Sequence, residues 1–60
     1  ARRRIQRALR GLGLYQAGID GAFGPLTRRA ITTFQRLRGF DATGVLTPSQ
    51  MDLLFDLAEG

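Results

Sequence analysis

Apolar residues recur at helical spacing near the start of the chain. With each residue turning by about 100°, one side of this stretch is apolar and the opposite side is basic. The apolar side carries Ile5, Ala8, Leu9 and Leu12, and the basic side carries Arg3, Arg7 and Arg10. Glycine is favoured just beyond a helix because it adopts a positive φ without a Cβ clash. The pattern therefore predicts an amphipathic helix that ends near Gly11 or Gly13.

A second helix is predicted from Pro25 to about Gly39. Proline suits the first helical position, where its missing N–H costs nothing, and Gly24 before it can serve as the N-cap. The side that we expect to face the core carries Leu26, Ala30, Phe34 and Leu37. The opposite side carries Arg28, Arg29, Thr32 and Arg36.

A third helix is predicted to begin after Thr47. Thr47 and Gln50 have the spacing of a capping box, in which each side chain bonds the backbone N–H of the other residue, and Pro48 lies at the first turn. The expected core stripe of this helix is Leu53, Leu54 and Leu57. A second apolar stripe consists of Met51, Phe55 and Ala58. We interpret it either as an edge of the core or as a surface that docks on an adjoining domain.

The two segments between the helices repeat one pattern at an offset of 23 residues. Gly21-Ala22-Phe23-Gly24-Pro25 aligns with Gly44-Val45-Leu46-Thr47-Pro48. In each copy glycine makes the bend, an apolar residue two positions later plugs the core, and proline starts the next helix. We therefore predict one all-α domain over residues 1–60, a small three-helix bundle with two glycine- and proline-rich interhelical loops.

The composition argues against catalysis. The chain has no Cys and no His, which removes disulfides, most zinc sites, a thiol nucleophile and the usual general base near neutral pH. Asp20 and Asp41 occupy turn-forming positions and have no evident catalytic partner. Asp20 also stands alone, whereas a calcium loop needs several oxygen ligands at alternating positions. We therefore expect no catalytic residue, no cofactor and no metal.

The charges are unevenly distributed along the chain. Residues 1–38 carry nine arginines against one acid, a net charge of +8, and residues 39–60 carry four acids and no base, a net charge of −4. Such a basic region attracts nucleic acid, acidic polymers or anionic membranes, or is simply a solvated helix face. No apolar run approaches the roughly 20 residues of a membrane span, and no apolar segment of a secretory signal follows the first arginines. We interpret a chain that opens directly on a helix as a module excised from a longer protein.

Four motifs in order resemble the peptidoglycan-binding domain 1 family of bacterial cell-wall hydrolases. They are IQRALRGLGLY in the first helix, IDGAFGPLT in the first loop, AITTFQ in the second helix and TGVLTPSQ in the second loop. The resemblance runs from Ile5 to about Leu54. One departure is Gln50, where the family usually has Thr. Because Gln can still complete the capping box, we expect the turn into the third helix to be kept.

The resemblance implies a three-helix module that holds an attached enzyme against the bacterial wall and does no chemistry itself. The implied partners are peptidoglycan, through its stem peptide or its glycan, and a covalently linked catalytic domain. The implied location is the cell envelope, either periplasmic or extracellular. The same fold resembles the prodomains of matrix metalloproteinases, so the alternative is a protein-interaction or prodomain-like module that packs against a neighbouring catalytic domain.

The residues around the first loop are the best ligand-binding candidates. Tyr can stack and donate a hydrogen bond, and Arg can grip a carboxylate through two hydrogen bonds beside a helix N-terminus. The candidates are Tyr15, Gln16, Thr27, Arg28 and Arg29. The alternative for the two arginines is that they only solvate the helix exterior.

Other motif residues are interpreted as scaffold. They are Asp20, Gly21, Phe23, Gly24, Pro25, Gln35 and Gly44. Asp20 before Gly21 is expected to accept hydrogen bonds from nearby backbone N–H groups and so fix the turn. Gln6 and Gln35 are core-adjacent amides, and the loop backbone can supply the partners that such amides need.

Three helices and nine arginines also permit a helix-turn-helix hypothesis of DNA binding. Two features oppose it. The loop between the second and third helices has about nine residues, whereas a helix-turn-helix has a turn of about three or four. The third helix, the usual reader, carries Asp52, Asp56 and Glu59, which repel phosphate. We therefore predict no nucleic-acid partner.

Overall fold

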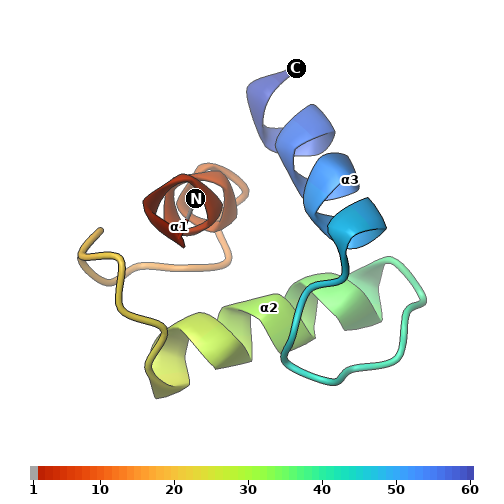
Figure 1. The fold of residues 1–60 in the computed structure, drawn as a ribbon, viewed down its shortest axis with the longest axis horizontal. Helices are drawn as coiled ribbons and strands as arrows, with labels where there is room; N and C mark the ends of the chain where they lie inside the picture. The colour runs from red at the N-terminus through yellow and green to blue at the C-terminus, as the bar shows by residue number, and fades with distance from the viewer. Residues whose placement is uncertain (1) are drawn as a thin grey trace.

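Three helices and two connecting loops make up the fold (Figure 1), which is given by a computed structural model that describes residues 2–60. The helices are α1 (Arg2–Gly11), α2 (Pro25–Leu37) and α3 (Pro48–Glu59). Figure 1 looks nearly along the axis of α1, while α2 and α3 run across the view. Helix α1 packs against both α2 and α3. No strand occurs within residues 2–60, and the predicted all-α class is confirmed.

The helix ends follow from a few residues at each boundary. At the end of α1, the N–H of Leu14 donates to the carbonyl of Leu9 at 2.9 Å, and α2 ends in the same way, with the N–H of Phe40 on the carbonyl of Gln35 at 2.8 Å. Gly24 is the N-cap of α2 and Pro25 is its first residue. At the start of α3, the predicted capping box between Thr47 and Gln50 is present in both directions.

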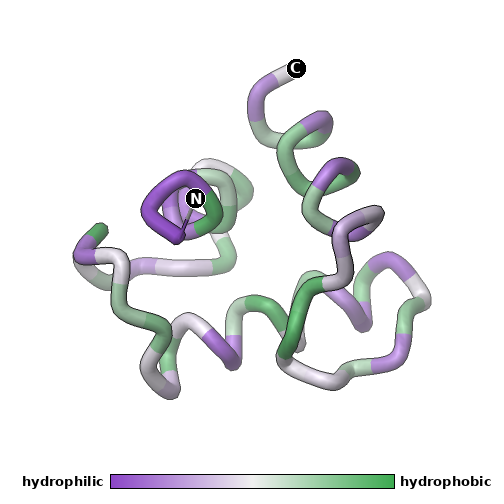
Figure 2. Tube along the Cα trace, viewed as in Figure 1, coloured by the Kyte–Doolittle hydropathy of each residue, from purple (hydrophilic) through white to green (hydrophobic). Residues whose placement is uncertain are grey.

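The hydrophobic core lies where α1 meets the other two helices. Figure 2 shows the hydrophobic turns of α1 and α3 facing each other. The buried apolar side chains are Ile5, Ala8, Leu9, Tyr15, Ala30, Ile31, Phe34 and Leu54. Side chains from both loops, including Phe23 and Leu46, are half-buried against this cluster. The predicted packing of these two loop residues on the core is confirmed.

The buried side of α2 differs from the expected one. Leu26 and Leu37 are 58% and 69% exposed, so the prediction that they face the core is wrong. The buried side is instead formed by Thr27, Ala30, Ile31, Phe34 and Gln35. Two polar residues can occupy it because hydrogen bonds inside the domain satisfy both side chains.

The buried side of α3 is also rotated from the expected stripe. Leu54 is fully buried, but Leu57 is 44% exposed and Leu53 is half-buried. Met51, Phe55 and Ala58 pack against the core. The guanidinium carbon of Arg4 also covers the Phe55 ring at 3.9 Å from its centroid. The second stripe therefore forms an edge of the core, the first of its two interpretations, and its docking on an adjoining domain stays a prediction.

The first loop is folded around the side chain of Gln6, which is fully buried. Its Oε1 accepts hydrogen bonds from the backbone N–H of Asp20 at 3.1 Å and of Gly21 at 2.8 Å. Its Nε2 lies 2.9 Å from the carbonyl oxygen of Ala22 and 3.2 Å from Oγ1 of Thr27. One amide thus supplies both the acceptor and the donor that the inward-facing backbone groups of the turn need.

The second loop is folded around Gln35 in the same way. Its Oε1 accepts from the N–H of Gly44 at 3.0 Å, and its Nε2 lies 2.9 Å from the carbonyl of Val45 and 3.0 Å from Oε1 of Gln50. Gly44, Val45 and Gln50 each follow their counterpart around Gln6 by the 23 residues of the sequence repeat. Gly44 has φ +79°, close to the +77° of its counterpart Gly21, a conformation that favours glycine. The repeat therefore encodes one turn, built twice around a buried glutamine.

Candidate functional site

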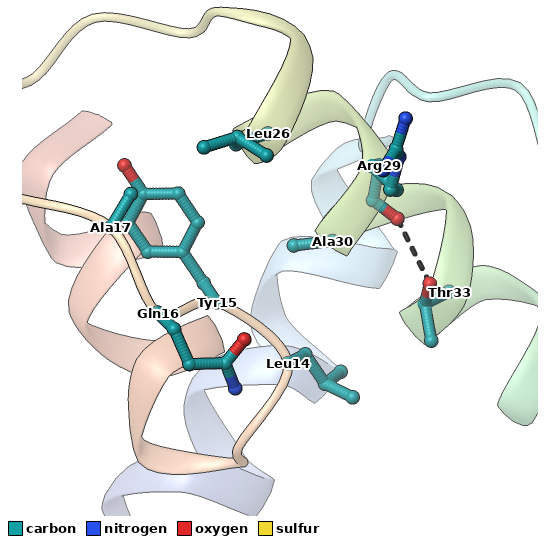
Figure 3. A pocket seen from close by; sticks show the side chains of 8 residues that line it. All are labelled: Leu14, Tyr15, Gln16, Ala17, Leu26, Arg29, Ala30 and Thr33. Atoms are coloured by element: carbon teal, nitrogen blue, oxygen red, sulfur yellow. Dashed lines mark hydrogen bonds between the residues drawn. The ribbon is translucent and has the colours of Figure 1, made fainter.

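A hollow of about 310 Å³ lies between the first loop and α2. Its lining consists of Leu14, Tyr15, Gln16, Ala17, Leu26, Arg29, Ala30 and Thr33. Figure 3 shows Tyr15 and Gln16, from the first loop, on one side of this hollow, and Arg29 and Thr33, from α2, on the other. The hollow therefore combines an aromatic ring, apolar side chains, an amide and a guanidinium.

The loop side of the hollow is held by short-range hydrogen bonds. The Tyr15 hydroxyl donates to the carbonyl oxygen of Gly18 at 2.7 Å, and the ring is only 5% exposed. Nε2 of Gln16 donates to the carbonyl of Gly13 at 2.7 Å, while the residue itself is exposed. Tyr15 thus acts mainly as a fixed wall, and Gln16 presents its remaining amide groups to solvent.

The helix side of the hollow is held by the regular backbone of α2. Thr33 donates its hydroxyl to the carbonyl of Arg29 at 3.0 Å, as the dashed line in Figure 3 marks. Arg29 is exposed, and the single ion pair among residues 2–60 joins Arg4 to Glu59. The guanidinium of Arg29 therefore has no carboxylate partner in the described part of the chain and is available to an anion.

A second hollow of about 220 Å³ continues the first along the start of α2. The two share Tyr15, Ala17 and Leu26, and the second adds Gly18, Asp20, Ala22, Gly24, Pro25 and Thr27. Together they form one furrow, which we call the loop groove. Leu26, with 58% of its surface exposed, lies where the two hollows meet.

Asp20 is the one acid that lines the loop groove. Its Oδ1 accepts a hydrogen bond from the backbone N–H of Ala22 at 2.9 Å, and Nε2 of Gln6 lies 3.2 Å away. These bonds, the one from Ala22 first, favour the charged carboxylate and lower the pKa of Asp20 below its usual value. The carboxylate is therefore engaged with the turn that contains it.

The structure divides the five ligand-binding candidates. Tyr15, Gln16 and Arg29 meet in the loop groove. Thr27 also lines the loop groove, but it is only 1% exposed, and its hydroxyl lies 3.2 Å from Nε2 of Gln6 inside the domain. Arg28 is exposed but lines a different hollow, since successive helical residues point about 100° apart.

Sequence reasoning missed several side chains of the groove, among them Ala17, Leu26 and Thr33. Hydropathy alone places Leu26 in the core, because it does not show that the polar neighbour Thr27 is buried in its place. The repeat carried a usable signal: Thr27 aligns with Gln50, and both side chains contact a buried glutamine amide. Placing Thr27 inside would have turned Leu26 outward.

The groove has the chemistry of a binding surface. Within residues 2–60, no three acidic side chains come together as ligands for a metal ion. Within the same residues, no helix has the length and apolar character required to cross a bilayer. The groove offers an apolar wall, amide hydrogen bonds and an unpaired cation, which fit the amides, sugar faces and carboxylates of a polar polymer.

The comparisons with known proteins identify the family. Residues 1–54 match the sequence model of a family described as a peptidoglycan binding domain. No curated protein and no solved structure gives a match. The matched segment contains α1, α2, both loops and the first part of α3, and therefore the whole loop groove. The chain belongs to the family of peptidoglycan binding domains.

Proposed function

We propose that this domain binds peptidoglycan in the loop groove and brings a covalently linked enzyme to the bacterial wall. The observation that carries the proposal is the meeting of Tyr15, Gln16 and the unpaired Arg29 in one hollow. The family match supplies the class of ligand, and the groove supplies the surface.

Each side of the groove suits one part of a wall polymer. The guanidinium of Arg29 binds a stem-peptide carboxylate through two parallel hydrogen bonds. Gln16 hydrogen-bonds a peptide or acetamido group, and Leu26 covers an apolar edge of the ligand. Tyr15 keeps the loop rigid, so that these groups are held in place before the ligand arrives.

Covalent linkage to an enzyme makes even weak binding by this domain effective. A groove of this size binds one short piece of polymer with modest affinity, but the wall repeats that piece many times. A linked enzyme is thereby kept at high local concentration on its substrate. The role places the domain in the cell envelope, on the periplasmic or extracellular side of the membrane.

Arg29→Gln tests the site by co-sedimentation with purified wall sacculi at physiological salt. Loss of a charge-assisted bond in the groove is expected to weaken retention by about tenfold. Arg36→Gln is the matched control, because Arg36 is an exposed arginine of the same helix that lines none of the three hollows described in this domain. Equal losses of retention in both variants would mean that the wall attracts only the net positive charge of the domain. Unchanged retention of Arg29→Gln would mean that the loop groove is not the binding site.

A further inference from the structure

A separate groove lies on the other flank of α2, with a volume of about 350 Å³. Both core plugs of the loop repeat, Phe23 and Leu46, contribute to its lining, together with Met51 of α3. Val45, which is 68% exposed, also lines the groove, as do Arg2 and Arg28. We call this hollow the plug groove.

The plug groove and the loop groove are independent surfaces. They share no lining residue. Arg28 and Ile31 of α2 line the plug groove, whereas Leu26, Arg29 and Ala30 line the loop groove. At about 100° per residue, these two sets lie on roughly opposite sides of the helix. A ligand in one groove therefore does not touch the other.

The plug groove is apolar inside and cationic at its edge. Phe23, Leu46 and Met51 are half-buried, so each keeps part of its apolar surface open to the hollow. Neither Arg2 nor Arg28 has an ion-pair partner among residues 2–60, and no acid lines the groove. The guanidinium carbon of Arg2 lies 5.5 Å from the centroid of the Phe23 ring.

The occupant that fits this surface carries a large apolar side chain beside a carboxylate. Both grooves have apolar walls, but the plug groove has two guanidinium groups and no acid, whereas the loop groove has one guanidinium and the carboxylate of Asp20. The plug groove therefore fits a more strongly acidic ligand than the loop groove does. A short acidic peptide with leucine or isoleucine satisfies both parts: the aliphatic group covers Phe23 and Leu46, and the carboxylate pairs with Arg28.

We propose that the plug groove docks an acidic, aliphatic peptide segment of a neighbouring protein domain. The domain would then have two faces, with the wall on one flank of α2 and a protein on the other. Docking on this face orients the partner domain relative to the wall, beyond what a flexible connection gives. The arginines raise the rate at which the acidic peptide associates, and the apolar contacts slow its dissociation.

The test uses the peptide Asp-Leu-Glu-Ile-Asp-amide, labelled with fluorescein at its amino terminus, and fluorescence anisotropy with the folded domain. Arg28→Gln and Val45→Ser are each expected to weaken binding by about tenfold, and Arg29→Gln to leave it unchanged. In sacculi co-sedimentation the pattern is expected to reverse, with Arg28→Gln unchanged. Circular dichroism verifies that every variant is folded.

Several results would overturn this inference. Absence of peptide binding by the folded wild type is one, and equal binding of a peptide with serine in place of Leu and Ile is another, because it would show charge attraction alone. A loss of sacculi retention in Arg28→Gln would assign the groove to the wall. Self-association of the wild type in analytical ultracentrifugation that Val45→Ser abolishes would assign it to a second copy of this chain.

Discussion

At the scale of single residues, two buried amides hold the two loops, the first of which lines the loop groove. Gln6 accepts from two backbone N–H groups, those of Asp20 and Gly21, whereas Gln35 accepts from one, that of Gly44. All fully buried side-chain nitrogens and oxygens in residues 2–60 have a partner. Because both loops fold onto such an amide, their geometry depends on two side chains that hydropathy marks as surface residues.

Gln6→Met is expected to destabilise the domain more than Gln35→Met. Methionine keeps most of the volume but removes the acceptor from part-buried backbone N–H groups, at up to about 1–3 kcal/mol for each. Gln6 serves two such groups and Gln35 serves one. A domain of this size has only about 3–9 kcal/mol of stability, so the difference is easily measured by urea denaturation.

Amide hydrogen exchange separates this explanation from a simple packing defect. Gln35→Met is expected to expose the N–H of Gly44 to exchange while the N–H of Gly21 stays protected. Equal stability losses in the two variants, with no change in the protection of these amides, would contradict the role of the glutamines.

The same residues mark the limit of sequence reasoning. The turn, the plug and the helix start were predictable because Gly, an apolar residue and Pro each leave a local signal. The exchange of Leu26 for Thr27 at the core face leaves no local signal, because the partner of the Thr27 hydroxyl is Gln6, a residue 21 positions earlier, and only the alignment of Thr27 with Gln50 in the repeat points to it. A local pattern carries no record of such a partner.

At the scale of elements, the end of α1 sets the direction in which the first loop leaves toward the site. Gly13 has φ +79°, while Gly11 is a regular residue of the helix, and a Cβ on either would meet no atom within 4 Å. A methyl group therefore has room at both Gly11 and Gly13, and the two positions differ only in backbone conformation.

Gly13→Ala is expected to destabilise the domain by about 1 kcal/mol, because an alanine at positive φ is strained. Gly11→Ala is expected to stabilise it by about 0.5–1 kcal/mol, because alanine is the better helix former. Thermal denaturation followed by circular dichroism would show melting temperatures that move in opposite directions. If both variants changed the melting temperature in the same direction, α1 would not end between Gly11 and Gly13 as described.

Helices α1 and α3 are joined by one exposed ion pair between Arg4 and Glu59, which we call the clasp. Nε of Arg4 donates to Oε2 of Glu59 at 2.9 Å, and its Nη2 donates to Oε1 at 2.6 Å. The same guanidinium lies over Phe55. The hydrogen bond from Arg4 is the main cause that lowers the pKa of Glu59 below its ordinary value of 4.5.

The stability of the domain is expected to fall in acid. Glu59 and Asp20 both have a lower pKa in the folded chain, so their contribution is complete above their ordinary values of 4.5 and 3.8 and is lost as the pH falls through the lowered values. Urea denaturation from about pH 6 to about pH 3 measures the loss. Glu59→Gln is expected to flatten the upper part of this curve, and an unchanged curve would mean that the clasp does not form in solution.

The helices were predictable from periodicity, but their rotation about their own axes was not. The spacing of Leu53 and Leu57 suits a core stripe as well as that of Met51 and Phe55 does. The structure turns the second stripe toward the core, where α3 meets α1 and Arg4 covers Phe55. This contact joins residues about fifty positions apart, and no pattern within α3 records it.

At the scale of the whole molecule, α2 separates two surfaces of different chemistry. The loop groove on one flank combines an amide, a guanidinium and a tyrosine wall, and the plug groove on the other has an apolar floor with arginines at its edge. Arg28 and Arg29 are neighbours in the sequence but lie in different grooves. A double substitution of these two arginines would therefore mix two effects that single variants keep apart.

The most direct test of the account is to map a soluble muropeptide onto the ¹⁵N-labelled domain by NMR. Chemical-shift changes are expected to concentrate at Gln16, Ala17, Arg29 and Thr33, with little change at Val45 or along α3, and Arg29→Gln is expected to weaken binding by about tenfold. Shift changes centred on the plug groove or on α3, or equal affinity in Arg29→Gln, would contradict the claim that the loop groove holds the wall.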